Sequence, residues 1–224
     1  STFSAFAISS RAAESKSKVE RSSVCEFERR MIDAGLINVK TVDPTLLVEL
    51  KYASPDNFMG EAVYGDLKEC YLQREAALKL KKAHDLLKAS HPNLRLLLGD
   101  GCRPRSIQRR MFSIVKGTPK QKYVANPAAG SMHNYGAAVD ITLADETGAR
   151  LDMGVPMDYF GILSHPGEEP RLLKEGRLTR KQVANRRLLR EVMTGAGFQG
   201  LSIEWWHFNA FDRKSVIGNF KIVE

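Results

Sequence analysis

The sequence predicts a single α+β domain, and three features of the 224-residue chain support this prediction. Segments with the apolar spacing of helices are mixed with β-prone runs, without the regular βαβ alternation of a parallel α/β fold. No stretch of low complexity divides the chain, and no internal repeat is visible. The composition is that of an ordinary globular protein, with 43% hydrophobic and 27% charged residues.

The amino-terminal part is expected to begin with an arm and to continue into the domain. Residues 1–23 are rich in Ser, Lys and Ala without periodicity, which predicts a loosely ordered arm before a domain over residues 24–224. Residues 25–37 predict a short helix that ends at Gly35. The β-prone and partly alternating residues 45–52 predict the first strand.

The middle of the chain combines an amphipathic helix with a buried strand. After a loop predicted over residues 53–66, apolar residues recur every three or four positions over residues 72–90, which is the spacing of such a helix. Pro92 ends this helix, and residues 94–98 predict a buried strand. Residues 99–104 contain two glycines and a proline and predict a sharp turn.

A second helix and a long irregular segment follow this turn. Pro104 suits the first position of a helix whose predicted apolar stripe is Ile107, Met111 and Ile114. Residues 117–136 contain two prolines and show no periodicity. Segments of this kind in compact domains are usually functional or mobile loops.

The last third of the chain predicts further strands and one helix. Residues 137–143 predict a strand, and residues 154–176 are predicted to be irregular. Thr179 then caps a helix, and residues 201–208 and 220–223 predict the final strands. One face of the predicted helix carries Ala184, Leu188, Val192 and Ala196.

The chain is basic, with 34 Lys and Arg against 26 Asp and Glu and a formal charge of +8. Such a surface attracts nucleic acid, an anionic membrane or an acidic cell wall, but ordinary solvated surface charge has the same composition. No arginine-rich arm or aromatic-interleaved RNA motif occurs, so we expect no nucleic-acid partner. No apolar run approaches the roughly 20 residues of a membrane helix, so we expect no membrane span. The sequence leaves the oligomeric state undetermined.

The cysteines and the first residues bear on the cellular compartment. The three cysteines cannot all pair within one chain, and none has the CxxC spacing of a zinc-thiolate site. Cys70 and Cys102 would form a disulfide in an exported protein or remain two buried thiols. The Ala-x-Ala pattern at residues 5–7 is typical of signal-peptide cleavage sites. We therefore expect the periplasm or cell envelope, with the cytoplasm as the alternative.

Two of the five histidines stand in a setting that suits metal-dependent catalysis. His133 precedes Asp140 by seven positions, and His207 follows Glu204 by three. Two imidazoles and a carboxylate would give zinc three protein ligands and leave a fourth position for water, as in catalytic zinc sites. Glu204 would then take a proton from the water and pass it to a leaving amine. The remaining histidines are expected to be structural or exposed: His84, His91 and His165.

Two points of geometry stay open at the level of the sequence. On a regular strand Glu204 and His207 point to opposite sides, so both face one metal only if the strand ends, bends or bulges at Trp205–Trp206. Arg103 follows a predicted strand, where its guanidinium would stabilise an oxyanion in a cleft. An ion pair between Arg103 and Asp100 that fixes the turn is the equal alternative.

Two motifs and several shorter segments carry a resemblance to a known family. The run Ser131-x-His133-x-x-Gly136-x-Ala138-x-Asp140, followed by Glu204-Trp-Trp-His207, resembles the M15 family of zinc D-Ala-D-Ala peptidases. Within this family the chain is similar to the D-alanyl-D-alanine dipeptidases. The narrower resemblance rests on residues 51–60, 100–104, 153–158, 185–187 and 197–198.

The resemblance implies a fold and an activity. The fold would be α+β, with an antiparallel sheet flanked by helices and a zinc ion in a constricted cleft. The activity would be hydrolysis of the dipeptide D-Ala-D-Ala, a small-molecule substrate, to D-alanine. One zinc ion would be held by His133, Asp140 and His207.

The resemblance also implies roles for residues around the metal. Glu204 matches the general base of the family, and Arg103 matches the arginine that stabilises the tetrahedral intermediate. Tyr52, Ser131 and Asp158 fall where the family binds the ends of the dipeptide.

Two departures from the family pattern leave the substrate range open. Cys102 stands where an aromatic residue often precedes the arginine, and the segment between the helix after this arginine and the His133 motif is shorter than in the vancomycin-resistance enzyme. A D,D-carboxypeptidase or a peptidoglycan endopeptidase of the same family is therefore the alternative function. A basic binding domain with a structural zinc, or with none, is the alternative from another class.

Overall fold

The computed structural model describes residues 25–224 of the chain. The arm expected over residues 1–23 and the Ala-x-Ala pattern at residues 5–7 lie outside the described residues. The loosely ordered arm and the location in the periplasm or cell envelope therefore stay predictions. Among the described residues, no helix is long and apolar enough to cross a membrane.

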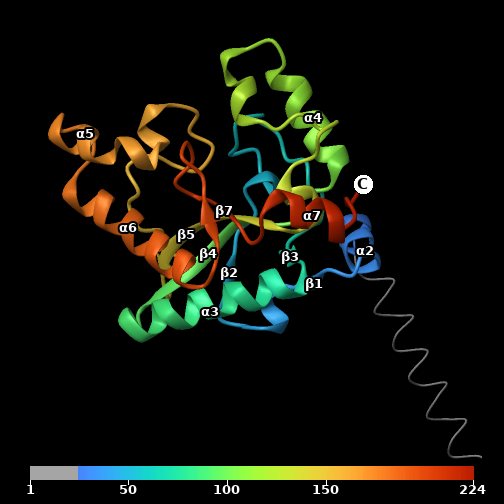
Figure 1. Cartoon of the computed structure of the whole chain (residues 1–224), viewed down its shortest axis with the longest axis horizontal. Coiled ribbons are helices and arrows are strands. Elements are labelled where there is room, and N and C mark those ends of the chain that lie inside the picture. Colours follow the sequence, from blue (N-terminus) through green and yellow to red (C-terminus); the bar gives the residue numbers. More distant parts are fainter. Residues whose placement is uncertain (1–24) are drawn as a thin grey trace, which may run out of the picture.

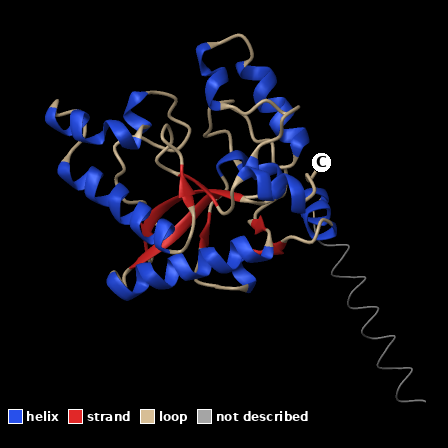
Figure 2. Cartoon of the chain, viewed as in Figure 1, coloured by secondary structure: helices blue, strands red, loops and turns tan. Residues whose placement is uncertain are grey.

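A five-stranded sheet forms the centre of the domain, with strand order β2-β4-β5-β7-β6 (Figure 2). The pair β2–β4 is parallel and the other pairs are antiparallel, so the predicted antiparallel sheet is confirmed with one parallel edge strand. A small antiparallel pair, β1 with β3, lies apart from it. The strands are β1 (Ile37–Asn38), β2 (Leu47–Val48), β3 (Tyr71–Leu72), β4 (Leu94–Asp100), β5 (Ala138–Asp145), β6 (Gln199–Gly200) and β7 (His207–Asn209).

Helices flank the sheet, and α3 and α6 pack against each other beside β4 and β5 (Figure 1). The predicted apolar positions of α3 are buried, which confirms the helical spacing read from the sequence. Loops above the sheet separate α4 on one side from α5 and α6 on the other. The α-helices are α2 (Glu26–Asp33), α3 (Arg74–Ser90), α4 (Arg105–Val115), α5 (Glu169–Lys174), α6 (Arg180–Gly195) and α7 (Arg213–Asn219). The 3₁₀ helices are η1 (Val39–Thr41), η2 (Lys51–Ala53), η3 (Pro119–Tyr123), η4 (Met132–Tyr135), η5 (Ile162–Ser164) and η6 (Pro166–Glu168).

Three strand predictions were too long or wrong. Only Leu47–Val48 of the strand expected over residues 45–52 pairs with a neighbour, because the chain turns into η2. The strand expected over residues 201–208 is a loop and turn that becomes β7 at His207, and residues 220–223 form no strand. Tyr52, Trp205 and Trp206 are β-prone, but they are buried in turns instead.

Two helix faces also differ from the prediction. Ile114 of α4 is 42% exposed, and Val115 takes its place in the core. In α6 the exposed Ala184 lies off the inward face, which carries Leu189 and the fully buried Arg186. An arginine can occupy such a face because its stem is apolar, and the Arg186 guanidinium donates to the Met153 carbonyl and lies over the Trp205 ring.

The structure has Cys70 and Cys102 as free thiols buried in the core, and Cys25 as a free, partly buried thiol. Of the two alternatives for Cys70 and Cys102, it therefore favours two buried thiols over a disulfide. Burial raises the pKa of both thiols above the ordinary value, so both remain protonated near neutrality.

Gly136 lets the helical turn η4 run directly into β5. Its backbone is left-handed, with φ of 65°, and a Cβ placed there would lie 2.5 Å from Leu36 Cδ2 and 3.2 Å from the Gln73 nitrogen. Only glycine fits such a position without strain and without displacing its neighbours. Gly136 thereby lets the chain pass from His133 in η4 to Asp140 in β5 within seven positions.

We predict that Gly136→Ala lowers the free energy of unfolding by about 2–4 kcal/mol, the sum of left-handed strain and overpacking. Gly148→Ala is the matched control, since Gly148 has φ of 90° but no described atom lies within 4 Å of where its methyl group would be. The control should lose only the strain part, about 1–2 kcal/mol. Urea unfolding measures both, and equal losses would show that the contact with Leu36 is irrelevant.

Candidate metal centre and cleft

The register of the sheet brings three functional side chains into one row. Asp100 on β4 lies opposite Asp140 on β5, and Asp140 lies opposite His207 on β7. Directly opposite residues of an antiparallel pair project from the same face of a sheet. A register shift between Leu98 and Asp100 marks the end of regular pairing on β4. These residues are far apart in the sequence, and the pairing of the strands unites them.

His133 reaches this row from the 3₁₀ turn η4. The Ser131 side chain caps the turn by accepting from the His133 nitrogen, and the Asn134 side chain accepts from the Ser131 nitrogen in return. The carbonyl of His133 also accepts from the Arg103 nitrogen at 3.0 Å. The Nδ1–H of His133 donates to the Gly101 carbonyl at 2.8 Å, which leaves the Nε2 lone pair to face the row.

The three predicted ligands converge on one point. His133 Nε2 lies 3.1 Å from His207 Nδ1 and 3.3 Å from Asp140 Oδ1, and the last two atoms are 3.1 Å apart. Zinc bonds of 2.0–2.2 Å in a tetrahedron require ligand atoms roughly 3.3 Å apart. These residues alone form a candidate metal cluster among residues 25–224. The separations therefore fit a zinc ion held by three ligands with one position open.

The charges of the cluster also suit a cation. Burial opposes ionisation of Asp140, but the imidazoles of His133 and His207 hold its pKa well below the ordinary value. Burial alone would lower the pKa of His133, whereas the charge of Asp140 raises it. A divalent ion can take the place of the proton that these groups would otherwise share.

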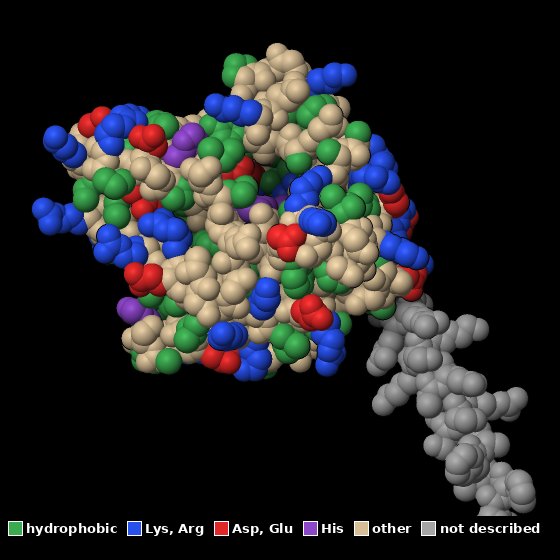
Figure 3. All heavy atoms as spheres, viewed as in Figure 1, with side chains coloured by type: hydrophobic (Ala, Val, Ile, Leu, Met, Phe, Trp, Pro, Cys, Tyr) green, Lys and Arg blue, Asp and Glu red, His purple; other side chains and the backbone are tan. Residues whose placement is uncertain are grey.

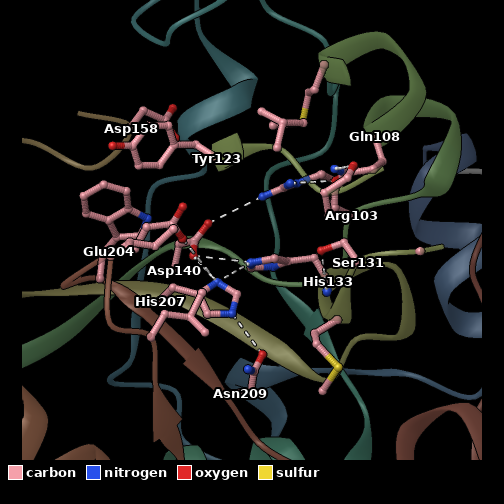
Figure 4. A pocket seen from close by; sticks show the side chains of 18 of the residues that line it. Arg103, Gln108, Tyr123, Ser131, His133, Asp140, Asp158, Glu204, His207 and Asn209 are labelled. Atoms are coloured by element: carbon pink, nitrogen blue, oxygen red, sulfur yellow. Dashed lines mark hydrogen bonds and ion pairs between the residues drawn. The ribbon is translucent and has the colours of Figure 1, made fainter. Parts of the chain in front are cut away.

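Asn209 completes the surroundings of His207 and was missed by the sequence analysis. Its Oδ1 accepts from His207 Nε2 at 2.9 Å, which turns Nδ1 towards Asp140 and His133 (Figure 4). The two residues lie two positions apart on β7 and so share a face. The available signal was therefore a hydrogen-bonding side chain two positions after a metal-binding histidine on a strand.

Glu204 lies where the chain turns before β7. A turn or bend was needed here, because Glu204 and His207 would point to opposite sides of a regular strand. The turn at Trp205–Trp206 ends the extended segment, so Glu204 and His207 face the same cavity. Glu204 Oε2 is 4.0 Å from His207 Nδ1. Burial raises the pKa of Glu204 to about 7. A carboxylate with such a pKa accepts and returns protons readily at neutral pH.

Arg103 forms the predicted ion pair with Asp100, and it also lines the cavity. Its Nε donates to Asp100 Oδ2 at 2.8 Å, so the turn is fixed by an ion pair. Its Nη2 also lies 3.5 Å from Asp140 Oδ2, and the residue lines the cavity. A second buried amide that the sequence analysis missed, Gln108, accepts from Arg103 Nη1 at 2.8 Å. The guanidinium is thereby held at the metal centre.

The three residues predicted to bind the substrate all line the same cavity. The buried Tyr52 hydroxyl donates to Asp158 Oδ1 at 2.8 Å. Asp158 Oδ2 is buried without a partner among the described residues, and the Asp158 backbone has φ of 68°. Burial raises the pKa of Asp158 to about 6. Ser131 uses its oxygen as a cap for η4, and its hydroxyl proton remains available to donate.

The cavity has a volume of about 440 Å³ and is open to one face of the molecule. Figure 3 shows this face hollowed, with a histidine visible in the hollow and Lys and Arg side chains around it. Apart from the site residues, the lining includes Phe58, Lys122, Tyr123, Phe160 and Arg213. A small charged molecule can therefore reach the metal centre.

The other histidines lie outside the metal centre. His84 is buried in α3, and its Nδ1 donates to Asp43 Oδ2 at 2.9 Å. His91 is exposed at the end of α3. His165 lies in a loop, with its ring 6.5 Å from that of Tyr123. These positions agree with the structural or exposed roles expected from the sequence.

Comparisons with known proteins show what this chain is similar to. Residues 32–221 match the M15 peptidase family, described as D-Ala-D-Ala dipeptidase. The D-alanyl-D-alanine dipeptidase of Escherichia coli K12 is 36% identical, over 77% of this chain and 83% of that protein. The D-alanyl-D-alanine dipeptidase of Enterococcus faecalis V583 is 30% identical, over 73% and 85%. A Zn(II) complex of the vancomycin-resistance D,D-pentapeptidase VanY is 18% identical, over 66% and 78%, with a TM-score of 0.31.

We predict that Asn209→Ala weakens zinc binding by about 10–100-fold, because His207 loses the group that orients its ring. Asn209→Asp keeps an acceptor for His207 Nε2–H and should bind zinc within a fewfold of the unaltered chain. Competition with a chromophoric chelator measures the zinc dissociation constant of each variant. An unchanged constant for Asn209→Ala would exclude the orienting role.

Proposed function

Since the chain belongs to the M15 peptidase family, we propose that it hydrolyses D-Ala-D-Ala to D-alanine with one bound zinc ion. The convergence of His133 Nε2, Asp140 Oδ1 and His207 Nδ1 at tetrahedral spacings is the observation that carries this proposal. The buried carboxylate of Glu204 beside them is the expected partner in peptide hydrolysis.

Each residue of the site has a defined task in this reaction. When bound, zinc supplies Lewis-acid polarisation of the scissile carbonyl. Glu204 removes a proton from the attacking water and returns it to the leaving amine, for which a pKa of about 7 is suited. Arg103 donates hydrogen bonds to the oxyanion that develops on the carbonyl oxygen. Asp100 and Gln108 hold the guanidinium in place for this task.

The ends of a dipeptide carry opposite charges, and the cavity offers complementary groups. Asp158 binds the ammonium group, because its buried Oδ2 has no partner among residues 25–224. Tyr52 orients this carboxylate through the bond to Oδ1. Ser131 donates to the carboxylate end from the opposite side of the metal centre. The substrate is thus aligned with its peptide bond at the metal.

We predict that the zinc-loaded protein cleaves free D-Ala-D-Ala with a higher kcat/KM than a pentapeptide that ends in the same pair. Removal of zinc with a chelator should abolish turnover, and added zinc should restore it.

Glu204→Gln should retain zinc but lose about 10²–10⁴-fold in kcat, the usual contribution of a general base. Release of D-alanine, measured with a coupled assay, follows each reaction.

Three outcomes would contradict this proposal. Preferential cleavage of the pentapeptide would favour the D,D-carboxypeptidase or endopeptidase alternative. Near-normal turnover by zinc-loaded Glu204→Gln would exclude Glu204 as the base. Absence of hydrolysis, together with salt-sensitive binding to polyanions, would favour a basic binding domain.

We predict that dipeptide binding weakens at acid pH because of Asp158, whose pKa is raised to about 6 by burial. Above this pH the carboxylate is charged and pairs with the ammonium group, which stays protonated up to about pH 8. Below it Asp158 is neutral, so the dissociation constant should rise by up to tenfold per pH unit. Calorimetry on zinc-loaded Glu204→Gln measures binding without turnover. Asp158→Asn should bind weakly and show a flat profile between pH 5 and 7; a matching slope in both proteins would contradict the assignment.

A further inference from the structure

Four aromatic rings form a continuous series along one side of the cavity. The ring centroids of Tyr52 and Phe58 are 6.3 Å apart, and those of Phe58 and Phe160 are 5.0 Å apart. Phe160 then stacks on Tyr123 at 4.9 Å with an angle of only 9° between the rings. All four residues line the cavity. We refer to Tyr52, Phe58, Phe160 and Tyr123 as the aromatic wall.

The Tyr123–Phe160 contact joins two sides of the molecule. Tyr123 ends η3, which follows α4, whereas Phe160 belongs to the loop that leads towards α5. Figure 1 shows α4 and α5 on opposite sides of the molecule. Parallel rings at this separation are in face-to-face contact, so no peptide chain passes between them. Both side chains are half-buried and line the cavity, so the stacked rings form part of its wall.

Asp158 lies next to the aromatic wall, through a hydrogen bond to Tyr52 and through its position in the chain near Phe160. Its Oδ1 accepts from the hydroxyl of Tyr52, and Phe160 follows it by two residues in the chain. Figure 4 shows Asp158 and Tyr123 at one end of the site, with Asn209 at the other. A group attached to an amine held by Asp158 would therefore lie close to the rings.

We propose that the Tyr123–Phe160 stack determines substrate length: it blocks extension beyond the amino-terminal residue, so that the enzyme accepts free dipeptides and rejects amino-extended peptides. This inference rests on the proposed function, in which Asp158 binds the ammonium group. The stack acts by occupying space, since one face of each ring is covered by the other ring. Tyr123 and Phe160 are thus specificity-determining residues and take no part in bond cleavage.

The test compares D-Ala-D-Ala with the tripeptide L-Lys-D-Ala-D-Ala on the zinc-loaded protein. Tyr123→Ala and Phe160→Ala should each raise the ratio of kcat/KM for tripeptide over dipeptide by tenfold or more, as removal of a steric block of this size does. Tyr123→Phe retains the ring and should keep the original ratio. Tyr159→Ala is the matched control, because Tyr159 is an exposed neighbour of Phe160 that does not line the cavity.

A binding measurement covers variants that turn over slowly. In the zinc-loaded Glu204→Gln background, Tyr123→Ala should tighten tripeptide binding relative to dipeptide binding by a similar factor, measured by calorimetry. An unchanged preference in both assays would overturn the role of the stack while leaving the proposed dipeptidase intact. Cleavage of the tripeptide by the unaltered protein as fast as the dipeptide would overturn the stack as a barrier. Failure of the unaltered protein to cleave D-Ala-D-Ala at all would instead remove the proposed function, and the inference with it.

Discussion

The pairing of β5 with β7 is the constraint on which the site depends, because it sets Asp140 directly opposite His207. The same row continues to Asp100 on β4, so two carboxylates are buried within one face of the sheet. Arg103 compensates one of these negative charges through its ion pair with Asp100 and approaches the other at 3.5 Å. Buried charges left without compensation are costly, and a divalent cation beside Asp140 would supply the missing positive charge. The pairing of the strands thus places a buried negative charge where a cation would bind.

Residue chemistry identified the three side chains that converge as a candidate metal site, whereas the groups that support them were hidden in the sequence. His133, Asp140 and His207 stand in short motifs, and two histidines together with a carboxylate are a typical set of zinc ligands. Asn209 and Gln108 are amides, which occur throughout ordinary surfaces, and only the folded geometry shows that each bonds a functional side chain. The contact between Phe160 and Tyr123 joins loops far apart in the chain, so no local pattern could predict it.

The errors in the predicted fold have a common physical origin. Local apolar spacing identified α3 because that helix packs by an apolar stripe. In α6 the inward face includes Arg186. Its charge predicts an exposed residue, but its apolar stem packs in the core and its guanidinium lies over the Trp205 ring. The segment before His207 has β-prone aromatic residues, but they pack as a turn, and this departure from a regular strand is what lets Glu204 face the metal centre. Tertiary packing overrode propensity where function required an irregular backbone.

Besides the shape of the cavity, the buried carboxylate of Asp158 would discriminate between substrates by the charge of their amino end. Its Oδ2 is buried without a hydrogen bond to any described residue, an arrangement that destabilises the free protein and that an ammonium group would relieve. An acylated amine carries no charge and donates one hydrogen bond at most, so a longer peptide leaves this carboxylate largely uncompensated. The aromatic wall rejects the same peptide by volume. Under the proposed function, charge and shape would therefore exclude amino-extended substrates independently, and loss of either would leave a partial preference for dipeptides through the other.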